Sequence, residues 1–422
     1  LFGLLAASAG CTDDLPTLTG EGLFPGGVRP STFEAVVPAE EYLRTLGRFS
    51  GYTGPRDASF FLLANRFDGV LDAHILSELV DFPRSLSFSF AGTQRTDSVF
   101  AFLAGSVTAT VDSLASEASG PFQVQVWEVG QDFDVTTATW ELAVDTVGAR
   151  VPWMTPGGTR GALLGEIQLA SPTSSGDTLR VPLDSLALKR IAADGFRGLL
   201  VTASGGGARL EVGNVSVQAQ VRPQGADTII NLRAPAGNAT FLFTPEPPVP
   251  TTAWQAGGIR SARTLLQLDV GLRVPVCRRG VCTDVPLREV TLNEVSLLLE
   301  PVPVPLGFRP LGRVPIVLRR IVEPELGRQA PLGEIVNDTS AVDRQSGRLV
   351  FAGSLFRPDD SIFAIPITSF VRNLLAGDST NATLALLGES SFSPVSTFGV
   401  AWFSPAPRLR IVYTVPERPN VP

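Results

Sequence analysis

Histidine, lysine and methionine are almost absent from this chain of 422 residues, which has one of each. The single histidine, His74, and the single lysine, Lys189, provide little of the side-chain chemistry that most hydrolases need. No Gly-x-Ser-x-Gly motif accompanies His74, so a Ser–His–Asp or Ser–Lys hydrolase is not expected. Charged residues make up only 18% of the chain and the net charge is −7, which argues against a surface that binds nucleic acid.

Long apolar runs are also missing. Hydrophobic residues reach 44%, yet no run of 18 or more apolar residues occurs, which excludes a protein that crosses a membrane several times with helices. The chain has 41 glycines and 34 prolines, together about 18% of its residues, against an average of roughly 12%. This composition favours many short strands that are joined by turns.

The first eleven residues form an apolar stretch in which small residues precede Cys11. The stretch resembles a bacterial lipobox, in which the cysteine is lipidated and becomes the first residue of the mature protein. Ala9 and Gly10 fit the pattern, whereas Ser8 stands where that family usually has leucine. The resemblance implies a lipid anchor on Cys11 and a position on the periplasmic or extracellular side of a membrane. The alternative is an uncleaved apolar segment, which would be either a membrane anchor whose start is missing or a stretch packed on a partner.

Two cysteines remain, Cys277 and Cys282, on either side of Arg278-Arg279-Gly280. Short β-type arms flank this tripeptide, so the two thiols are expected to face each other across a hairpin and form a disulfide. An even number of remaining cysteines suits an oxidising compartment. A metal site would need more ligands and a haem attachment needs Cys-x-x-Cys-His, so we expect no metal and no other cofactor.

Apolar and polar residues alternate with a period of two through much of the chain, as in Phe122–Trp127 and Arg408–Tyr413. Helical signal is scarce. One candidate helix covers Pro38–Gly47, and two short amphipathic turns cover Ala187–Asp194 and Val371–Asp378. The predicted fold class is all-β, with two tandem antiparallel, jelly-roll-like β-sandwich domains and a few short helices.

The two halves of the chain repeat several features in the same order. Leu164-Gly165-Glu166-Ile167 recurs as Leu332-Gly333-Glu334-Ile335, and each half continues with an X-Pro strand, a short helix and an apolar strand. A duplicated unit of roughly 190 residues is long enough to bury its own core. We therefore predict a signal-like segment and Gly/Pro-rich tether at 1–33, one sandwich at 34–224, a second sandwich at 225–416 and a tail at 417–422.

Three stretches resemble the DNRLRE-type β-sandwich, a family that includes carbohydrate-binding modules. The stretches are Trp140 with Trp153 and Pro156-Gly157-Gly158, then Val181–Val201 and its counterpart Ile365–Leu387, and finally Ala406–Tyr413. The resemblance implies a sandwich fold for both units. The second unit lacks the stretch with two tryptophans, so the resemblance does not imply a ligand site that both units share.

Trp140 and Trp153 flank a loop and are the candidates for stacking on sugar rings, a role that requires exposed rings. Trp127 lies on an alternating strand and is expected in the core. Asp132 and Asp134 could act as acids or calcium ligands, but their turn-rich context favours hydrogen bonds to the local backbone.

The residue inventory favours a non-catalytic protein. We expect a lipid-anchored structural or scaffolding subunit that docks on the periplasmic face of a large membrane protein complex and reaches the bilayer through its N-terminus. The combination of features resembles the extracytoplasmic accessory subunits of bacterial photosynthetic reaction-centre complexes, which implies a reaction centre–light-harvesting complex as the partner. The alternative is a cell-surface carbohydrate-binding lipoprotein. Exposed rings at Trp140 and Trp153 would favour sugar binding, and buried rings would favour the structural role.

Overall fold

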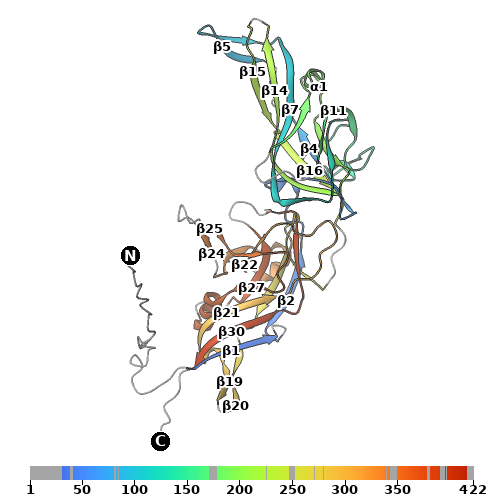
Figure 1. Cartoon of the computed structure of the whole chain (residues 1–422). Helices are drawn as coiled ribbons and strands as arrows, with labels where there is room; N and C mark the ends of the chain where they lie inside the picture. The colour runs from blue at the N-terminus through green and yellow to red at the C-terminus, as the bar shows by residue number, and fades with distance from the viewer. Residues whose placement is uncertain are drawn as a thin grey trace, which may run out of the picture.

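A computed structural model describes the chain from residue 31 to residue 415. The residues left out within this span are 39–40, 80–81, 84, 171–177, 225, 247–251, 270, 279, 339, 343–348, 378–380, 390–394 and 396. Antiparallel strands dominate, which confirms the all-β prediction, and they build two bodies, named here sandwich 1 and sandwich 2 (Figure 1). Cys11, most of the predicted tether and the predicted tail lie outside the described residues.

Sandwich 1 is one ten-stranded sheet that folds over itself around a single core. Its strands are β3 (Phe61–Phe67), β4 (Leu71–Glu78), β7 (Phe100–Ala118), β8 (Phe122–Val129), β11 (Arg160–Leu169), β12 (Thr178–Leu183), β13 (Leu199–Ser204), β14 (Ala208–Pro223), β15 (Ile230–Pro235) and β16 (Asn238–Phe243). One layer has the order β12-β7-β14-β15 and the other contains β11-β8-β13-β4, with β3 and β16 beside β4. The long strands β7 and β14 run through both layers and bend where their pairing is interrupted, as between Gly213 and Ser216.

Sandwich 2 packs a four-stranded sheet against a six-stranded sheet. The first sheet has the order β1 (Ser31–Pro38), β30 (Arg408–Val415), β21 (Thr291–Leu299) and β27 (Phe363–Pro366). The second has the order β2 (Leu43–Phe49), β18 (Arg263–Leu268), β28 (Thr383–Gly388), β22 (Val314–Ile321) and β23 (Leu332–Ile335), with β26 (Ser354–Phe356) beside β22.

Smaller elements complete the fold. The two-stranded ribbons are β5 (Leu86–Phe90) with β6 (Thr93–Asp97), β9 (Leu142–Thr146) with β10 (Ala149–Pro152), β17 (Trp254–Gly257) with β29 (Val400–Phe403), β19 (Arg273–Arg278) with β20 (Val281–Pro286), and β24 (Ser340–Val342) with β25 (Leu349–Ala352). The helices are α1 (Ser185–Ile191) and α2 (Thr368–Ala376), with 3₁₀ turns η2 (Pro55–Asp57), η3 (Leu287–Glu289) and η4 (Pro324–Gln329). Among the described residues no helix has the length and apolar character to cross a membrane.

Local sequence explains most of these elements. In β12 every second residue is buried, so Leu179, Val181 and Leu183 enter the core of sandwich 1 as the alternation predicts. The two predicted short helices are present as α1 and α2. The carboxylate of Asp184 caps α1 by accepting a hydrogen bond from the backbone N–H of Ala187 at 2.7 Å.

The helix predicted for Pro38–Gly47 is wrong, because Pro38 ends β1 and residues 43–47 belong to β2. β1 pairs along its whole length with β30, and β2 pairs with β18. The two sheets of sandwich 2 offer unpaired strand edges at these positions. Pairing there satisfies the backbone of residues 31–38 and 43–49 and overrides their weak helical preference.

The two sandwiches share the order of their strands. The layer β12-β7-β14-β15 corresponds to β27-β21-β30-β1, and the layer β11-β8-β13-β4 corresponds to β23-β22-β28-β18. In both, a short helix joins corresponding strands, since α1 connects β12 to β13 and α2 connects β27 to β28. The repeated sequence features therefore occupy equivalent places in the two folds.

Two strands of each sandwich lie outside the segment predicted for it. β1 lies beside β30 as β15 lies beside β14, and β2 lies beside β18 as β16 lies beside β4. β1 and β2 thus belong to sandwich 2, and β15 and β16 belong to sandwich 1. The predicted boundaries, 34–224 and 225–416, do not follow this pairing, because the strands of sandwich 1 occupy the continuous segment 61–243 between β2 and β17 of sandwich 2.

An apolar cluster fills the junction between the two sandwiches. Its buried members are Phe60, Leu62, Ala64, Phe67, Leu71, Ala73 and Phe241 from the sandwich 1 side and Ile259, Phe308, Val395 and Phe398 from loops of sandwich 2. The rings of Phe308 and Phe398 stack with their centres 5.4 Å apart. Burying one such side chain contributes about 1.5–3 kcal/mol, so the cluster gives the two bodies a substantial apolar contact.

Arg209 of β14 lies within this junction with no exposed surface. Its Nη1 donates to the backbone oxygens of Gly307 at 3.1 Å and Arg309 at 2.7 Å, both in sandwich 2. The guanidinium carbon lies 5.1 Å from the ring centre of Phe67 and 5.6 Å from that of Phe398, so one aromatic face from each sandwich borders the charge. Nη1 therefore has its acceptors only when both sandwiches are in place, whereas Nε and Nη2 are buried without a hydrogen-bond partner within the described residues.

A second charged group strengthens the same junction. Arg309 of sandwich 2 donates to the carboxylates of Asp68 at 3.1 Å and Glu117 at 2.8 Å in sandwich 1. The same Asp68 Oδ2 also accepts a hydrogen bond from the backbone N–H of Gly307 at 3.0 Å. Gly307 has φ +84°, and a Cβ there would approach Leu71 to 2.7 Å, so only glycine allows this close contact.

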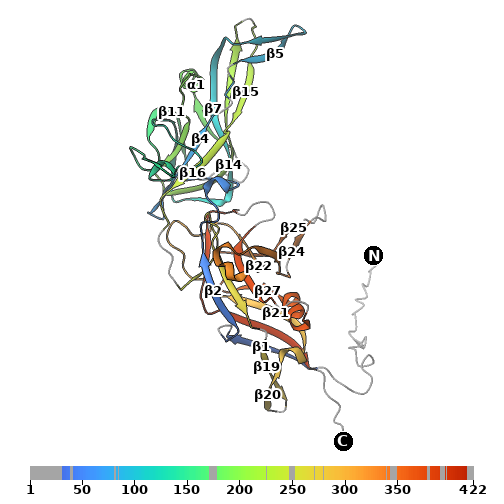
Figure 2. The ribbon, with the colours of Figure 1, turned by 180° about the vertical axis from the view of Figure 1, so that it is seen from behind.

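The ribbon β19–β20 extends from the part of sandwich 2 that is remote from sandwich 1 (Figures 1 and 2). Cys277 and Cys282 are directly opposite each other in its register and form a disulfide, as predicted. The loop that the bond closes is short, so the disulfide holds the tip of the ribbon without linking distant parts of the fold.

We expect the double change Cys277→Ser and Cys282→Ser to lower the free energy of unfolding by at most about 2 kcal/mol, because a short closed loop restricts the unfolded chain little. Urea denaturation of the variant and the wild type measures this difference. A loss of cooperative unfolding would contradict the assignment of the bond to a local role.

Candidate functional site

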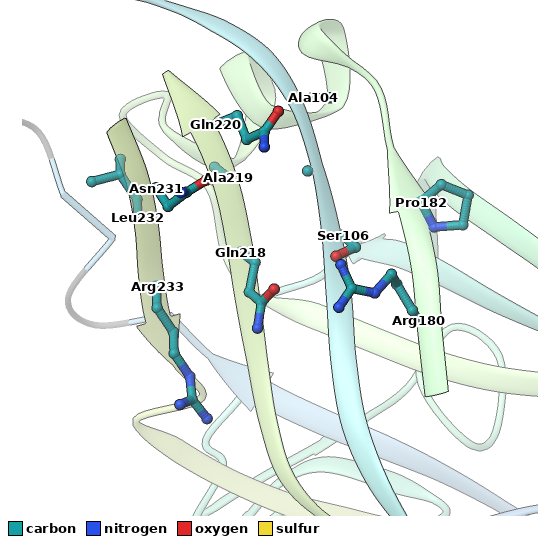
Figure 3. Close-up of a pocket in the computed structure, with 11 residues that line it drawn as sticks. Ala104, Ser106, Arg180, Pro182, Gln218, Ala219, Gln220, Asn231, Leu232 and Arg233 are labelled. Atoms are coloured by element: carbon teal, nitrogen blue, oxygen red, sulfur yellow. The ribbon is translucent and has the colours of Figure 1, made fainter. Parts of the chain in front are cut away.

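A hollow on sandwich 1 lies on the outward face of the layer β12-β7-β14-β15 (Figure 3). It has a volume of about 500 Å³, and residues of all four strands line it. We call it the β7 trough, because β7 forms its floor while β12 lies on one side and β14 and β15 on the other. Its position on consecutive strands means that the register of the sheet sets its geometry.

Three consecutive rows of cross-strand neighbours make up the β7 trough. The first row is Arg180–Thr108–Ser216, the second is Pro182–Ser106–Gln218–Arg233, and the third is Ala104–Gln220–Asn231. The residues that β7 contributes are small, whereas those of the flanking strands are long. This difference in side-chain size hollows the sheet face along β7 and needs no break in the backbone.

Buried hydroxyl groups lie in the floor and beside it. Thr108 and Ser216 adjoin the lining residues, and their oxygens lie 3.0 Å apart in a hydrogen bond. Arg233 Nε donates to the same Ser216 oxygen at 3.3 Å, which holds the guanidinium beside this pair. Ser106 is only 4% exposed, yet its hydroxyl makes no hydrogen bond within the described part of the chain. The floor therefore contains an unused hydrogen-bonding group.

The charge of the β7 trough is positive. Arg180 and Arg233 contribute two guanidinium groups, and no aspartate or glutamate lines the hollow. Within the described residues, neither arginine forms an ion pair. On a chain of net charge −7, this is a local reversal of sign that attracts negatively charged groups.

The two tryptophans predicted as sugar platforms lie elsewhere, over the outer face of the other layer. Trp153 is 5% exposed, and its Nε1 donates to the backbone oxygen of Thr139 at 2.9 Å. Trp140 is half-buried, with its ring centre 5.0 Å from that of His74. Both rings pack in a small apolar cluster, so neither offers a free face of the kind that stacking on sugars requires. Trp127, expected in the core, faces outward and is half-buried beside them.

The side chain of His74 is buried and hydrogen-bonded to the backbone. It is 7% exposed, and its Nδ1 lies 2.6 Å from the backbone oxygen of Gly157, to which the neutral ring donates. Burial lowers its pKa to about 4, so the ring is neutral at neutral pH. The hydrogen bond to Gly157 is the only one that its side chain makes within the described residues.

The candidate carboxylates also have local partners. Asp134 accepts hydrogen bonds from the backbone N–H and the hydroxyl of Thr136 at 2.9 and 2.6 Å, and these bonds lower its pKa. Asp132 pairs with Arg197 at 2.6 Å on the surface. Within the described ranges no group of three or more His, Cys, Asp and Glu side chains is placed to hold a metal ion.

No protein-family model matches the chain, and no curated protein matches it. The resemblance to DNRLRE-type sandwiches and to accessory subunits of reaction-centre complexes therefore stays a prediction. The arguments about function below rest on the geometry of the chain itself.

The residues of the β7 trough were not singled out by the sequence. The alternation of β14 indicates that Ser216, Gln218 and Gln220 share one face, but it does not reveal which strands lie beside them. Ser106 and Arg180 reach this face from strands far away in the chain. A run of alternating serine and glutamine on a strand is the one signal that could have drawn attention to it.

Two buried groups give opposite pH dependences to stability. Burial raises the pKa of Glu211 in the junction to about 7, so in the folded state it keeps a proton that the unfolded chain loses near pH 4.5. Its contribution to stability therefore falls as the pH rises from 4.5 to 7. His74 stays neutral in the folded state down to about pH 4, whereas the unfolded chain protonates it below 6.5. Its contribution falls as the pH drops from 6.5 to 4.

We expect Glu211→Gln to make the free energy of unfolding rise with pH between 4.5 and 6.5, by up to about 1.4 kcal/mol per pH unit relative to the wild type. His74→Asn should change the slope by a similar amount in the opposite direction. Urea denaturation at several pH values in this window measures both slopes, with Asp132→Asn as a surface control. If both variants keep the wild-type pH dependence, the assignment of buried protonation states is wrong.

Proposed function

We propose that the protein is a lipid-anchored, non-catalytic structural subunit that docks on the periplasmic face of a large membrane protein complex. The observation that supports this most is the junction between the sandwiches. The chain crosses it twice, from β2 to β3 and from β16 to β17, so both ends of sandwich 1 are joined to sandwich 2. A body of this kind keeps a fixed shape, which is what a bracing subunit requires.

The position of the chain ends supports an anchor on sandwich 2. Ser31 is paired with Val415, so the described chain begins and ends on neighbouring strands. β1 and β30 lie in the part of sandwich 2 that is remote from sandwich 1 (Figures 1 and 2). Cys11 precedes Ser31 by twenty residues, which can span at most about 70 Å. A lipid on Cys11 would therefore hold the start of β1, at the end of sandwich 2 remote from sandwich 1, within about 70 Å of the membrane.

The identity of the host complex is also a proposal. The resemblance to accessory subunits of photosynthetic reaction-centre complexes makes a reaction centre–light-harvesting complex the first partner to examine. The interface of such a subunit would be stable and bury on the order of 1,000 Å² or more. Exposed apolar side chains on both sandwiches, including Val99, Ile229 and Leu306, offer surface for it.

The second candidate is a cell-surface carbohydrate-binding lipoprotein. The observation that favours it is the β7 trough, since its amide, hydroxyl and guanidinium groups could bond sugar hydroxyls. The packing of Trp140 and Trp153 counts against it, because these were the rings expected to stack on sugars.

The proposal is tested by tagging the full-length chain in its native host and extracting membranes with a mild detergent. We expect the protein to purify with a membrane protein complex in fixed stoichiometry, and its mature N-terminus to carry diacylglycerol on Cys11. Cys11→Ser should move the protein to the soluble fraction, whereas Cys277→Ser with Cys282→Ser serves as a cysteine control that stays with the membrane.

Two results would contradict the proposal. One is a protein that elutes alone from solubilised membranes and is retarded by a polysaccharide column, which would establish the carbohydrate candidate instead. The other is an intact, unmodified peptide that contains Leu1 to Cys11, because it would remove the lipid anchor.

A further inference from the structure

We propose that the β7 trough receives one acidic side chain of the partner protein, whose carboxylate pairs with Arg180 above the Ser106 hydroxyl. This inference rests on the proposed docking function and adds the chemistry of one contact. The occupant is a single aspartate or glutamate on an extended segment or loop tip of the partner.

Three side chains that can donate hydrogen bonds surround the middle of the trough. Arg180 points from β12 toward Ser106 on β7, and the Gln218 amide lies on the other side of β7 (Figure 3). None of the three side chains forms a hydrogen bond or an ion pair within the described residues. A carboxylate accepts hydrogen bonds at both oxygens and carries the charge that a guanidinium attracts, so it suits this set of donors.

The Ser106 hydroxyl is a second observation that points to a ligand. Ser106 is only 4% exposed and lines the hollow. Buried hydroxyl groups normally have a hydrogen-bond partner, because an unmade bond costs free energy. The buried hydroxyls beside it, those of Thr108 and Ser216, bond to each other, so Ser106 is the exception in this part of the sheet. A carboxylate that enters above Ser106 supplies its acceptor.

The two arginines of the trough have different roles. Arg180 is exposed and has no acidic partner among the described residues, so its guanidinium is available for a direct pair. Arg233 Nε donates to Ser216, and its guanidinium is directed away from Arg180 (Figure 3). We therefore assign the direct pair to Arg180 alone. The charge of Arg233 strengthens the positive potential around the site, since no acidic side chain lines the hollow.

The width of the trough limits what can bring the carboxylate. β12 and β14 are two strand spacings apart, about 10 Å, and their long side chains narrow the space between them. A helix has a diameter of about 10–12 Å and cannot reach the floor, whereas an extended segment or a loop tip can. The backbone of β7 is paired on both sides, so only side chains can hold the occupant.

The rest of the lining suits a polypeptide. The hollow of about 500 Å³ is larger than a carboxylate, so the acid comes with attached groups. Gln220 and Asn231 make no side-chain hydrogen bond within the described residues, and their amides can bond peptide N–H and C=O groups. Pro182 and Leu232 offer apolar contact. No aromatic ring lines the hollow to stack on a sugar, so an acidic polysaccharide is a separate outcome of the test.

Crosslinking of the full-length protein in its native membranes tests the contact. Arg180→Lys keeps the positive charge and places an amine in the trough. A carbodiimide then joins this amine to a carboxylate that touches it, forming an amide with loss of water. The chain has one native lysine, Lys189, so the background measured on the wild type is low. We expect an amide to one aspartate or glutamate of another polypeptide, found by mass spectrometry at a yield at least tenfold above background.

Arg160→Lys is the matched control. Arg160 is exposed on β11 in the other layer of sandwich 1, and it forms no ion pair within the described residues. We expect no amide above background in this variant. The proposal is overturned if Arg180→Lys gives no amide, if both variants give equal yields, or if the amide joins a carboxylate of the same chain. An adduct with a polysaccharide would also overturn it and would favour the carbohydrate candidate.

The rate of release from the purified complex measures the strength of the contact. Arg180→Gln should leave the complex at least tenfold faster than the wild type at physiological salt, because losing one member of a charged pair acts mainly on dissociation. Arg160→Gln should leave at the wild-type rate. Both positions are exposed, so neither change should affect folding. Wild-type release by Arg180→Gln would overturn the proposal.

The wild type separates this inference from the proposed function. If the wild type purifies with a complex but Arg180→Lys gives no amide to it, the inference is wrong and the docking function stands. If the wild type purifies with no other protein, the docking function fails, and the inference fails with it.

Discussion

Arg209 is the charged side chain on which the arrangement of the two sandwiches depends. Its guanidinium has no exposed surface, and its bonded partners are backbone oxygens of the other sandwich. Burial lowers its pKa to about 10, which still leaves it charged at neutral pH. The lowered pKa means that the junction replaces only part of the hydration that this charge has in water, so burying Arg209 carries a desolvation cost. The apolar cluster and the pairs of Arg309 with Asp68 and Glu117 offset this cost, while Arg209 sets how the two sandwiches fit together.

Two chain connections explain why the sandwiches stay adjacent. Sandwich 1 is formed by the continuous segment from β3 to β16, which lies between β2 and β17 of sandwich 2. Both ends of sandwich 1 are therefore joined to sandwich 2. β2 pairs with β18 and β16 pairs with β4, so the strands that carry these connections are fixed in their own sheets. The position of one sandwich is thus coupled to that of the other.

This coupling links the fold to the proposed role. A subunit that braces a membrane complex has to transmit a position from its anchor to its binding surface, and flexible tandem domains cannot do this. The β7 trough gains from the same rigidity, because its polar groups are held by sheet register and by the hydrogen bonds of the Ser216 hydroxyl to Thr108 and Arg233. Side chains that are already oriented lose less entropy when a partner binds.

Local pattern predicted much of the fold and little of the site. Alternation in segments such as β12 and β30 identifies strands, and the repeated features place α1 and α2 correctly. The Cys277–Cys282 bond follows from a short loop between two arms. The place of β1 and β2 in sandwich 2 could not be predicted, because their partner strands β30 and β18 lie far away in the sequence and local pattern does not identify them. The trough was missed for the same reason, since its rows join residues that only tertiary pairing brings together.

The central claim is that the two sandwiches form one rigid body, and a distance measured across the junction tests it most directly. Spin labels on Val147→Cys in sandwich 1 and Val322→Cys in sandwich 2, both at exposed positions, report this distance in a Cys11→Ser background. The account predicts one narrow distance distribution that does not change with salt. A broad distribution, or two separate distances, would contradict it.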